Sequence, residues 1–154
     1  MPPAKTLHGF RSGRIERALE VFIEQHQLGI VTGEGGYLLQ HDPDTVRAPD
    51  AAFLAVDRIP PGGLPEDAYV DGAPNLAVEV VSPDDRDGDI AEKVALWLAA
   101  GAERVWEVRP RTRTVTVHRP RAAPTTLRPE DTLTSDDAAF VVPGFALSVR
   151  SIFE

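Results

Sequence analysis

A single carboxylate interrupts an apolar stretch near the middle of the chain. Residues 76–82 read LAVEVVS, and Glu79 is the only charged residue among them. A segment that is apolar on both faces predicts a central strand covered on both sides of a sheet. An ionised carboxylate in that position is costly unless something compensates its charge. An arginine, a raised pKa that keeps the acid neutral, or a metal ion shared with other oxygen atoms would each provide the compensation.

Two other residues are expected to meet Glu79. Asp50 enters an apolar segment directly after Pro49, where the chain is held extended. A divalent cation between the two carboxylates would remove their mutual repulsion. Lys93 falls inside the broad apolar arc of a predicted helix, so its ammonium is expected to face the sheet. The alternative is an aliphatic stem that covers the core while the ammonium stays at its edge.

Composition bounds the class of protein in which these residues act. The chain has 154 residues, of which 42% are hydrophobic and 26% charged, so we expect one folded domain over residues 1–154. The absence of cysteine excludes disulfides, thiolate zinc sites and cysteine nucleophiles. No apolar run approaches the roughly 20 residues of a membrane span, and the N-terminus lacks the apolar core of a secretory signal. We therefore expect a cytoplasmic protein without membrane contact.

The elements that must position these residues alternate between helices and strands. Apolar spacing predicts a helix over 12–28 with Ser12 as N-cap and Gly29 beyond its end, preceded by a flexible N-terminus over 1–10. A second helix over 90–100 is expected to open with a capping box of Asp89 and Glu92. Strands are predicted at 29–32, 36–40 and 46–56 as a meander, and at 76–82 as the central strand. A hairpin is predicted from strands at 104–108 and 114–118, and a strand and a short helix over 141–153. This order predicts an α/β or α+β sheet sandwiched by helices.

Other polar clusters favour structural roles. The acidic segment after the central strand lacks the glycine and terminal glutamate of an EF-hand and is typical of a helix start; it contains Asp84, Asp85, Asp87 and Asp89. No two histidines have ligand spacing, so each is expected at the surface: His8, His26, His41 and His118. The sequence contains neither a glycine-rich phosphate loop nor a nucleophile elbow.

Four segments together resemble the Uma2 family of restriction endonucleases, which belongs to the PD-(D/E)xK nuclease superfamily. They are TVRAPDAAFLAVDRIPPGG, DGAPNLAVEVVSPDDR, AEKVALWLAAGAERVWEV and RTRTVTVHRP. The most specific pieces are the Pro49-Asp50 pair, the string from Glu79 to Pro83, and Lys93 in the helix before Gly101. The similarity extends over nearly the whole chain.

The resemblance implies a restriction-endonuclease-like fold, a mixed β-sheet flanked by helices, with Asp50 and Glu79 binding Mg²⁺ or Mn²⁺ and the carbonyl of Val80 as a further ligand. The superfamily usually places its lysine two residues after the acid, where this chain has Val81. The Uma2-like pattern places it on the next helix, at Lys93.

The same resemblance suggests additional acids for the site. A carboxylate from the first helix often completes such sites, and the candidates are Glu16 and Glu20. Glu34 resembles a family glutamate before the predicted meander, or it is a solvated turn acid.

The implied activity is metal-assisted hydrolysis of DNA phosphodiester bonds by Asp50, Glu79 and Lys93. A formal net charge of -8 argues for weak or transient DNA contact, made through hairpin arginines: Arg109, Arg111, Arg113, Arg119 and Arg121. Two alternatives stay open: a non-catalytic binding or assembly module that keeps the nuclease fold, and a hydrolase of another phosphate ester. A homodimer is also compatible with the sequence.

Overall fold

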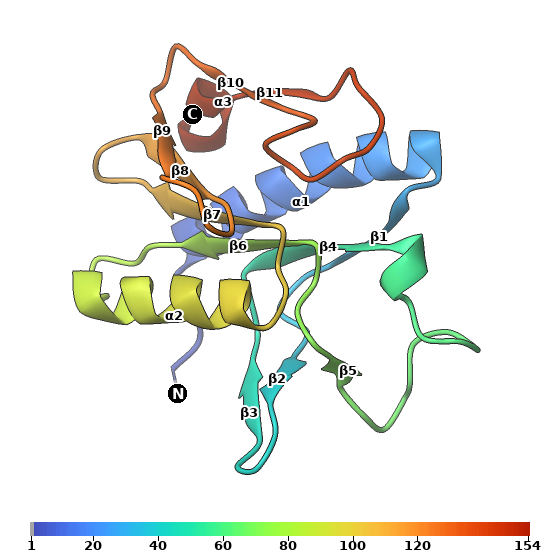
Figure 1. Cartoon of the computed structure of the whole chain (residues 1–154). Coiled ribbons are helices and arrows are strands. Elements are labelled where there is room, and N and C mark those ends of the chain that lie inside the picture. The colour runs from blue at the N-terminus through green and yellow to red at the C-terminus, as the bar shows by residue number, and fades with distance from the viewer. Residues whose placement is uncertain (1) are drawn as a thin grey trace.

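A computed structural model describes residues 2–154, which form a six-stranded mixed sheet with helices on both faces (Figure 1). The strand order is β1-β4-β6-β7-β8-β9. The bounds are Gly29–Thr32 for β1, Ala51–Ala55 for β4, Leu76–Val80 for β6, Arg104–Arg109 for β7, Thr114–His118 for β8 and Thr125–Leu127 for β9. The restriction-endonuclease-like α/β class predicted from the sequence is confirmed.

Strand β6 lies in the interior of the sheet, where its apolar side chains are covered on both faces. It pairs antiparallel with β4 and parallel with β7, and all five of its residues are buried. Ala77 packs toward helix α2 (Asp87–Ala99), whereas Leu76 and Val78 pack toward helix α1 (Thr6–His26). The lone charged residue of this strand, Glu79, is therefore on the α2 face, where alternation along a strand places it with Ala77.

The predicted meander is wrong, because β1 pairs directly with β4 and the two strands between them in the chain join a separate small sheet. That small sheet has the order β3-β2-β5 and consists of Thr45–Arg47 (β3), Tyr37–Gln40 (β2) and Val70–Asp71 (β5). A 3-10 turn, Val56–Arg58, leads from β4 into the exposed excursion before β5. The hairpin of β2 and β3 projects away from the main sheet (Figure 1).

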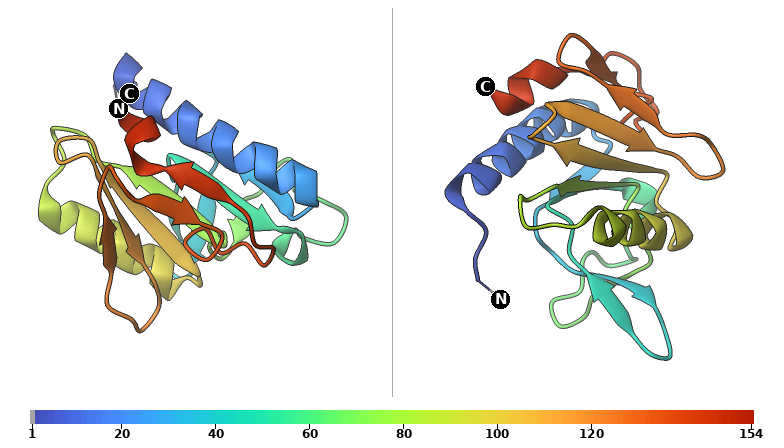
Figure 2. Two further views of the ribbon diagram at one scale, coloured as in Figure 1. Left: turned by 90° about the horizontal axis from the view of Figure 1, so that it is seen from above. Right: turned by 90° about the vertical axis from the view of Figure 1, so that its left-hand side faces the viewer.

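The C-terminal segment lies against α1 on the face opposite α2 (Figure 2). It contains β10 (Thr132–Thr134), β11 (Ala146–Ser148) and α3 (Val149–Phe153). Phe140 stacks on Phe22 of α1 with ring centroids 5.2 Å apart, and Phe145 meets both rings edge-on. This aromatic cluster anchors the C-terminal segment to the helix.

Both long helices begin earlier than the sequence predicted. Helix α1 begins at Thr6, so the expected flexible N-terminus over 1–10 is helical from Thr6 onward, and Ser12 donates a hydrogen bond to the His8 carbonyl instead of capping. Helix α2 begins at Asp87 without a side-chain cap, so the capping box of Asp89 and Glu92 is also wrong. Within the described residues, no helix is long and apolar enough to cross a membrane.

Gly29 allows the start of β1 to approach β4 closely. A Cβ atom at this position would lie 2.2 Å from the Leu54 carbonyl oxygen, a distance that no side chain tolerates. We expect Gly29→Ala to lower the free energy of unfolding by about 2 kcal/mol or more, because the two strands must separate. Gly13→Ala is the control: the position is helical with open space around it, so stability should rise by up to about 1 kcal/mol. Urea denaturation measures both, and equal effects would contradict the assigned contact.

Candidate active site

Glu79 lies in a nearly closed environment between β6 and α2. The residue is only 5% exposed, and its Oε1 accepts a hydrogen bond of 2.8 Å from the indole Nε1 of Trp97. Its Oε2 lies 4.0 Å from Nζ of Lys93, whose side chain is 40% exposed. Lys93 and Trp97 are four residues apart, so both project from one face of α2. Lys93 therefore has its ammonium at the boundary between Glu79 and solvent.

Asp50 precedes β4 and is held by the backbone of β6. Its N–H donates to the Val78 carbonyl, although Val78 pairs in register with Ala51. Two consecutive residues thus face one residue of the neighbouring strand, as in a β-bulge, an arrangement that redirects side chains. The Asp50 Oδ2 accepts the N–H of Val80 at 2.6 Å, which places this carboxylate beside the end of β6.

His8, near the start of α1, holds the other oxygen of Asp50. Its Nε2 lies 2.9 Å from Oδ1, and both side chains are largely buried. Because an ionised carboxylate only accepts hydrogen bonds, the imidazole is the donor in this pair. The prediction that His8 is an ordinary surface residue is wrong, and α1 is thereby linked to the site.

The electrostatic environment raises the pKa of Glu79 to about 7, mainly through burial. The Trp97 hydrogen bond and the Lys93 ammonium act in the opposite direction, while Asp50 and Asp85 favour the protonated form by repulsion. Burial and the neighbouring acids therefore destabilise the charged form of Glu79, and the ammonium of Lys93 compensates only part of that effect.

The three additional acids differ in their relation to Asp50. Glu16 on α1 is half-buried, and its pKa is raised by burial and by repulsion from Glu20, Glu34 and Asp50. Glu20 and Glu34 are exposed. Glu16 is thus the first-helix carboxylate that extends the acidic environment of Asp50, and its role as a ligand remains a prediction.

The donor set at the end of β6 fits a hard divalent cation. Asp50 and Glu79 supply carboxylate oxygens, and a cation shared between them would offset the burial and the repulsion that raise the pKa of Glu79. Among residues 2–154, no three His, Cys, Asp or Glu side chains are grouped so that they could hold a metal ion. Mg²⁺ is commonly bound by one or two carboxylates, with water and substrate phosphate as the other ligands, so two acids are sufficient.

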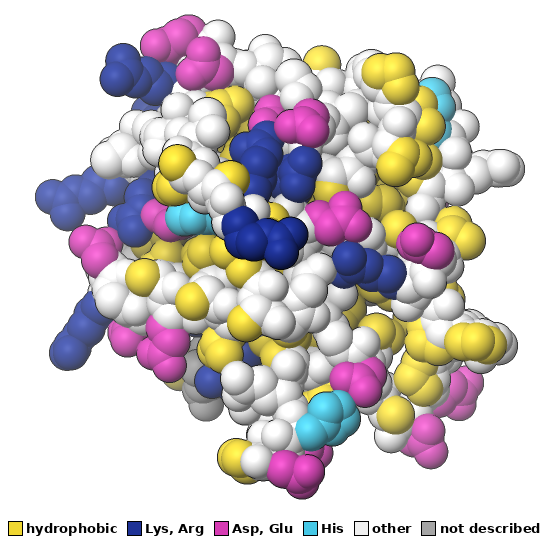
Figure 3. Space-filling model, in the orientation of Figure 1, with side chains coloured by type: hydrophobic (Ala, Val, Ile, Leu, Met, Phe, Trp, Pro, Cys, Tyr) yellow, Lys and Arg dark blue, Asp and Glu magenta, His cyan; other side chains and the backbone are white. Residues whose placement is uncertain are grey.

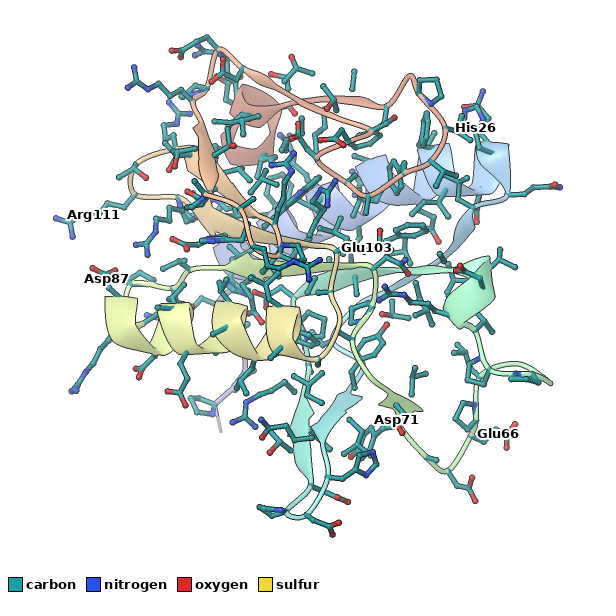
Figure 4. All side chains as sticks on the ribbon, viewed as in Figure 1. His26, Glu66, Asp71, Asp87, Glu103 and Arg111 are labelled. Atoms are coloured by element: carbon teal, nitrogen blue, oxygen red, sulfur yellow. The ribbon has the colours of Figure 1, made fainter. Side chains whose placement is uncertain are left out.

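The hairpin arginines do not form one free basic cluster. Arg109 pairs with Glu107 and Asp87, and Arg119 pairs with Asp136 and Asp137. The exposed ones are Arg111 and Arg113 in the β7–β8 turn, and Arg121 in the β8–β9 turn at the other end of β8. Arg111 lies at the same edge as Asp87 (Figure 4), and basic and acidic side chains alternate over this face (Figure 3).

Reasoning from the sequence missed two residues of the site, His8 and Trp97. Trp97 belongs to the apolar arc of its helix and is fully buried. Its distance of four residues from Lys93 and the need of a buried indole N–H for an acceptor were the available signal. No local pattern marks His8, because its partner Asp50 lies 42 positions further along the chain.

Glu79 should make the metal-free protein less stable as pH rises. Its pKa in the folded protein, about 7, lies above the ordinary value of 4.5, so the folded state holds the proton more tightly. The resulting stabilisation is complete below pH 4.5 and is lost as pH rises through 7. In chelator, we expect Glu79→Gln to be the more stable protein at pH 8, by up to about 3 kcal/mol, with the difference vanishing near pH 4.

The matched control is Glu92→Gln, an exposed glutamate on the adjacent helix α2. Its denaturation midpoint should follow that of the unsubstituted protein at every pH. A pH dependence in Glu79→Gln as steep as in the unsubstituted protein would show that another group is responsible.

Comparison with known proteins identifies the fold and the family. A solved structure described as a "putative nuclease belonging to DUF820 from Anabaena variabilis" superposes with a TM-score of 0.77 at 20% identity, covering 99% of this chain and 83% of that chain. At this identity the likeness establishes the fold. A search of curated proteins found no match. Residues 1–150 match the family described as "Uma2: Putative restriction endonuclease", and the chain therefore belongs to the Uma2 family.

Proposed function

We propose that this protein is a metal-dependent endonuclease that hydrolyses phosphodiester bonds in DNA, with Asp50, Glu79 and Lys93 as its catalytic residues. The observation that carries the proposal is the placement of Glu79. A carboxylate that is 5% exposed on an interior strand, beside a second carboxylate and 4.0 Å from an ammonium, is costly for folding alone. Membership of the Uma2 family, together with the nuclease-like fold, supports the assignment.

Asp50 and Glu79 would hold Mg²⁺ or Mn²⁺ through their carboxylate oxygens, with the Val80 carbonyl as a further ligand. The bound ion would supply activation of water and neutralisation of charge on the scissile phosphate. Trp97 fixes one oxygen of Glu79, which leaves Oε2 toward Lys93. His8 and the Val80 N–H fix the orientation of Asp50 in the same way.

In this proposal Lys93 acts on the substrate. With 40% of its side chain exposed, its ammonium reaches solvent while remaining within 4.0 Å of Glu79. From that position it would stabilise the negative charge that develops on the phosphate, or orient the attacking water. A lysine whose stem only covers the core would show the same exposure, so cleavage by a Lys93 variant separates the two roles.

DNA contact in this proposal is weak. The net charge is -8, and two of the five hairpin arginines are neutralised by internal acids. Few cations are then left to displace the counterions of a duplex, so affinity should be low and should fall as salt rises. Assays for cleavage belong at low ionic strength.

The same two features favour the alternative of a non-catalytic module that keeps the nuclease fold. Binding of Mn²⁺ separates the two proposals, because only a nuclease needs the metal. Isothermal titration with Mn²⁺ should detect binding to the unsubstituted protein and none to Asp50→Asn. Asparagine still offers an oxygen to the Val80 N–H, so this variant should fold.

Lys93→Met should abolish cleavage without unfolding the protein, since methionine keeps much of the apolar stem and removes the ammonium. Losing one well-placed charge stabiliser costs about 10²–10³ in kcat in a comparable oxyanion site. The control is Lys5→Met, which replaces the only other lysine of the chain, an exposed residue before α1. Cleavage of single- and double-stranded DNA with Mg²⁺ and Mn²⁺ measures the effect. Unchanged cleavage in Lys93→Met would remove this lysine from the mechanism.

His8→Ala should weaken Mn²⁺ binding while leaving both carboxylates in place. Residues that orient metal ligands typically contribute about 10–100-fold to metal affinity, and His8 orients Asp50. His41→Ala is the control, because His41 forms a similar pair with Asp71 on an exposed turn. Equal Mn²⁺ affinities of the two variants in calorimetry would assign His8 a structural role only.

A further inference from the structure

The outer face of α1 carries large apolar side chains with no cover. Leu7, Phe10 and Val21 are 54%, 52% and 63% exposed. Together with Arg14, Arg17 and Glu24 they form a stripe with alternating spacings of three and four residues, opposite the face that packs on the sheet. The guanidinium of Arg14 lies over the Phe10 ring, 4.8 Å from its centroid. We call these six residues the α1 stripe.

An open groove of about 590 Å³ runs beside the α1 stripe, between α1 and the C-terminal segment. Its floor is mainly apolar and includes Ala18, Phe22, Phe145, Leu147 and Ile152. Seen from above, α1 and the C-terminal segment run side by side along the molecule (Figure 2). Three residues of the stripe line the groove, Arg14, Arg17 and Val21, so stripe and groove adjoin on one surface.

Two opposite charges of the α1 stripe have no ionic partner. Arg17 and Glu24 are both exposed and lie on either side of Val21, and neither forms an ion pair within residues 2–154. Arg14 differs, because its guanidinium donates a hydrogen bond to the Ser151 carbonyl. The charges of the stripe that need an external partner are therefore one arginine and one glutamate.

We propose that the α1 stripe and its groove bind a second copy of this chain, with the two α1 helices antiparallel about a twofold axis. In that arrangement Arg17 of each helix faces Glu24 of the other with Val21 near the axis, and every favourable contact occurs twice. Val21 and the neighbouring apolar groove are buried at the same time.

Other occupants match these features less well. A nucleic acid or an anionic lipid surface would attract Arg17 but would leave Glu24 without a cation. A partner that offers both a carboxylate and a cation at the same spacing satisfies both residues. A second copy of the chain supplies that pattern without any further component.

Sedimentation velocity over a micromolar concentration series tests the apolar part of the interface. The unsubstituted protein should be a dimer, and Val21→Glu should weaken the dimer at least about tenfold. Val56→Glu is the matched control, because Val56 is 60% exposed, almost the same as Val21, but follows β4 away from α1. A monomeric unsubstituted protein, or equal weakening by both variants, would overturn the proposal.

Charge reversal tests the antiparallel orientation. Arg17→Glu makes the outer face of α1 more acidic, and Glu24→Arg makes it more basic, so each variant alone should dimerise less well at low salt. A mixture of the two should form heterodimers more tightly than either forms homodimers. Failure of the mixture to associate while the unsubstituted protein dimerises would place the interface elsewhere. Both substitutions are at exposed positions, so loss of folding is not expected, and circular dichroism verifies it.

Discussion

The burial of one carboxylate, Glu79, is the constraint on which the site and much of the surrounding structure depend. Strand β6 is covered on both faces, so its fourth residue has no access to bulk water. The fold compensates with an indole N–H, a lysine ammonium and a pKa raised to about 7. Trp97 contributes to this in two ways, because its ring fills the core under β6 while its N–H satisfies the acid. The packing of α2 and the chemistry of Glu79 therefore cannot vary independently.

Asp50 is tied to the same strand by a different physical device. The extra residue before β4 turns its carboxylate onto the Val80 N–H, and His8 closes the arrangement from α1. Elements from both faces of the sheet thus converge at the end of β6: α1 through His8, and α2 through Lys93 and Trp97. Displacing either helix would change the geometry of the carboxylate pair. This shared dependence explains why a site of few polar groups requires most of the domain to form it.

The sequence predicted those parts of the fold that local patterns encode. The apolar segment around Glu79, the helix carrying Lys93 and the hairpin from Arg104 were placed nearly correctly, because hydrophobic spacing determines which face of an element is buried. Helix starts were misplaced, since α1 and α2 begin without side-chain caps. The pairing of β1 with β4 skips β2 and β3, and such long-range pairing leaves no local signal. For the same reason, the ionic partners of Arg109 and Arg119 and the contact between His8 and Asp50 were not foreseen.

Charge is distributed in this protein so that its cations serve distinct purposes. Arg58, Arg104, Arg109 and Arg119 hold loops and strands together through acids of the same chain. Lys93 is within reach of a buried acid and of solvent at once. Arg17 on α1 serves neither purpose, because it is exposed and forms no ion pair within the described residues. Since α1 also supplies His8, any contact that fixes the position of this helix also restrains Asp50. Helix α1 thus supports the site through His8 on one face and presents an uncovered apolar surface on the other.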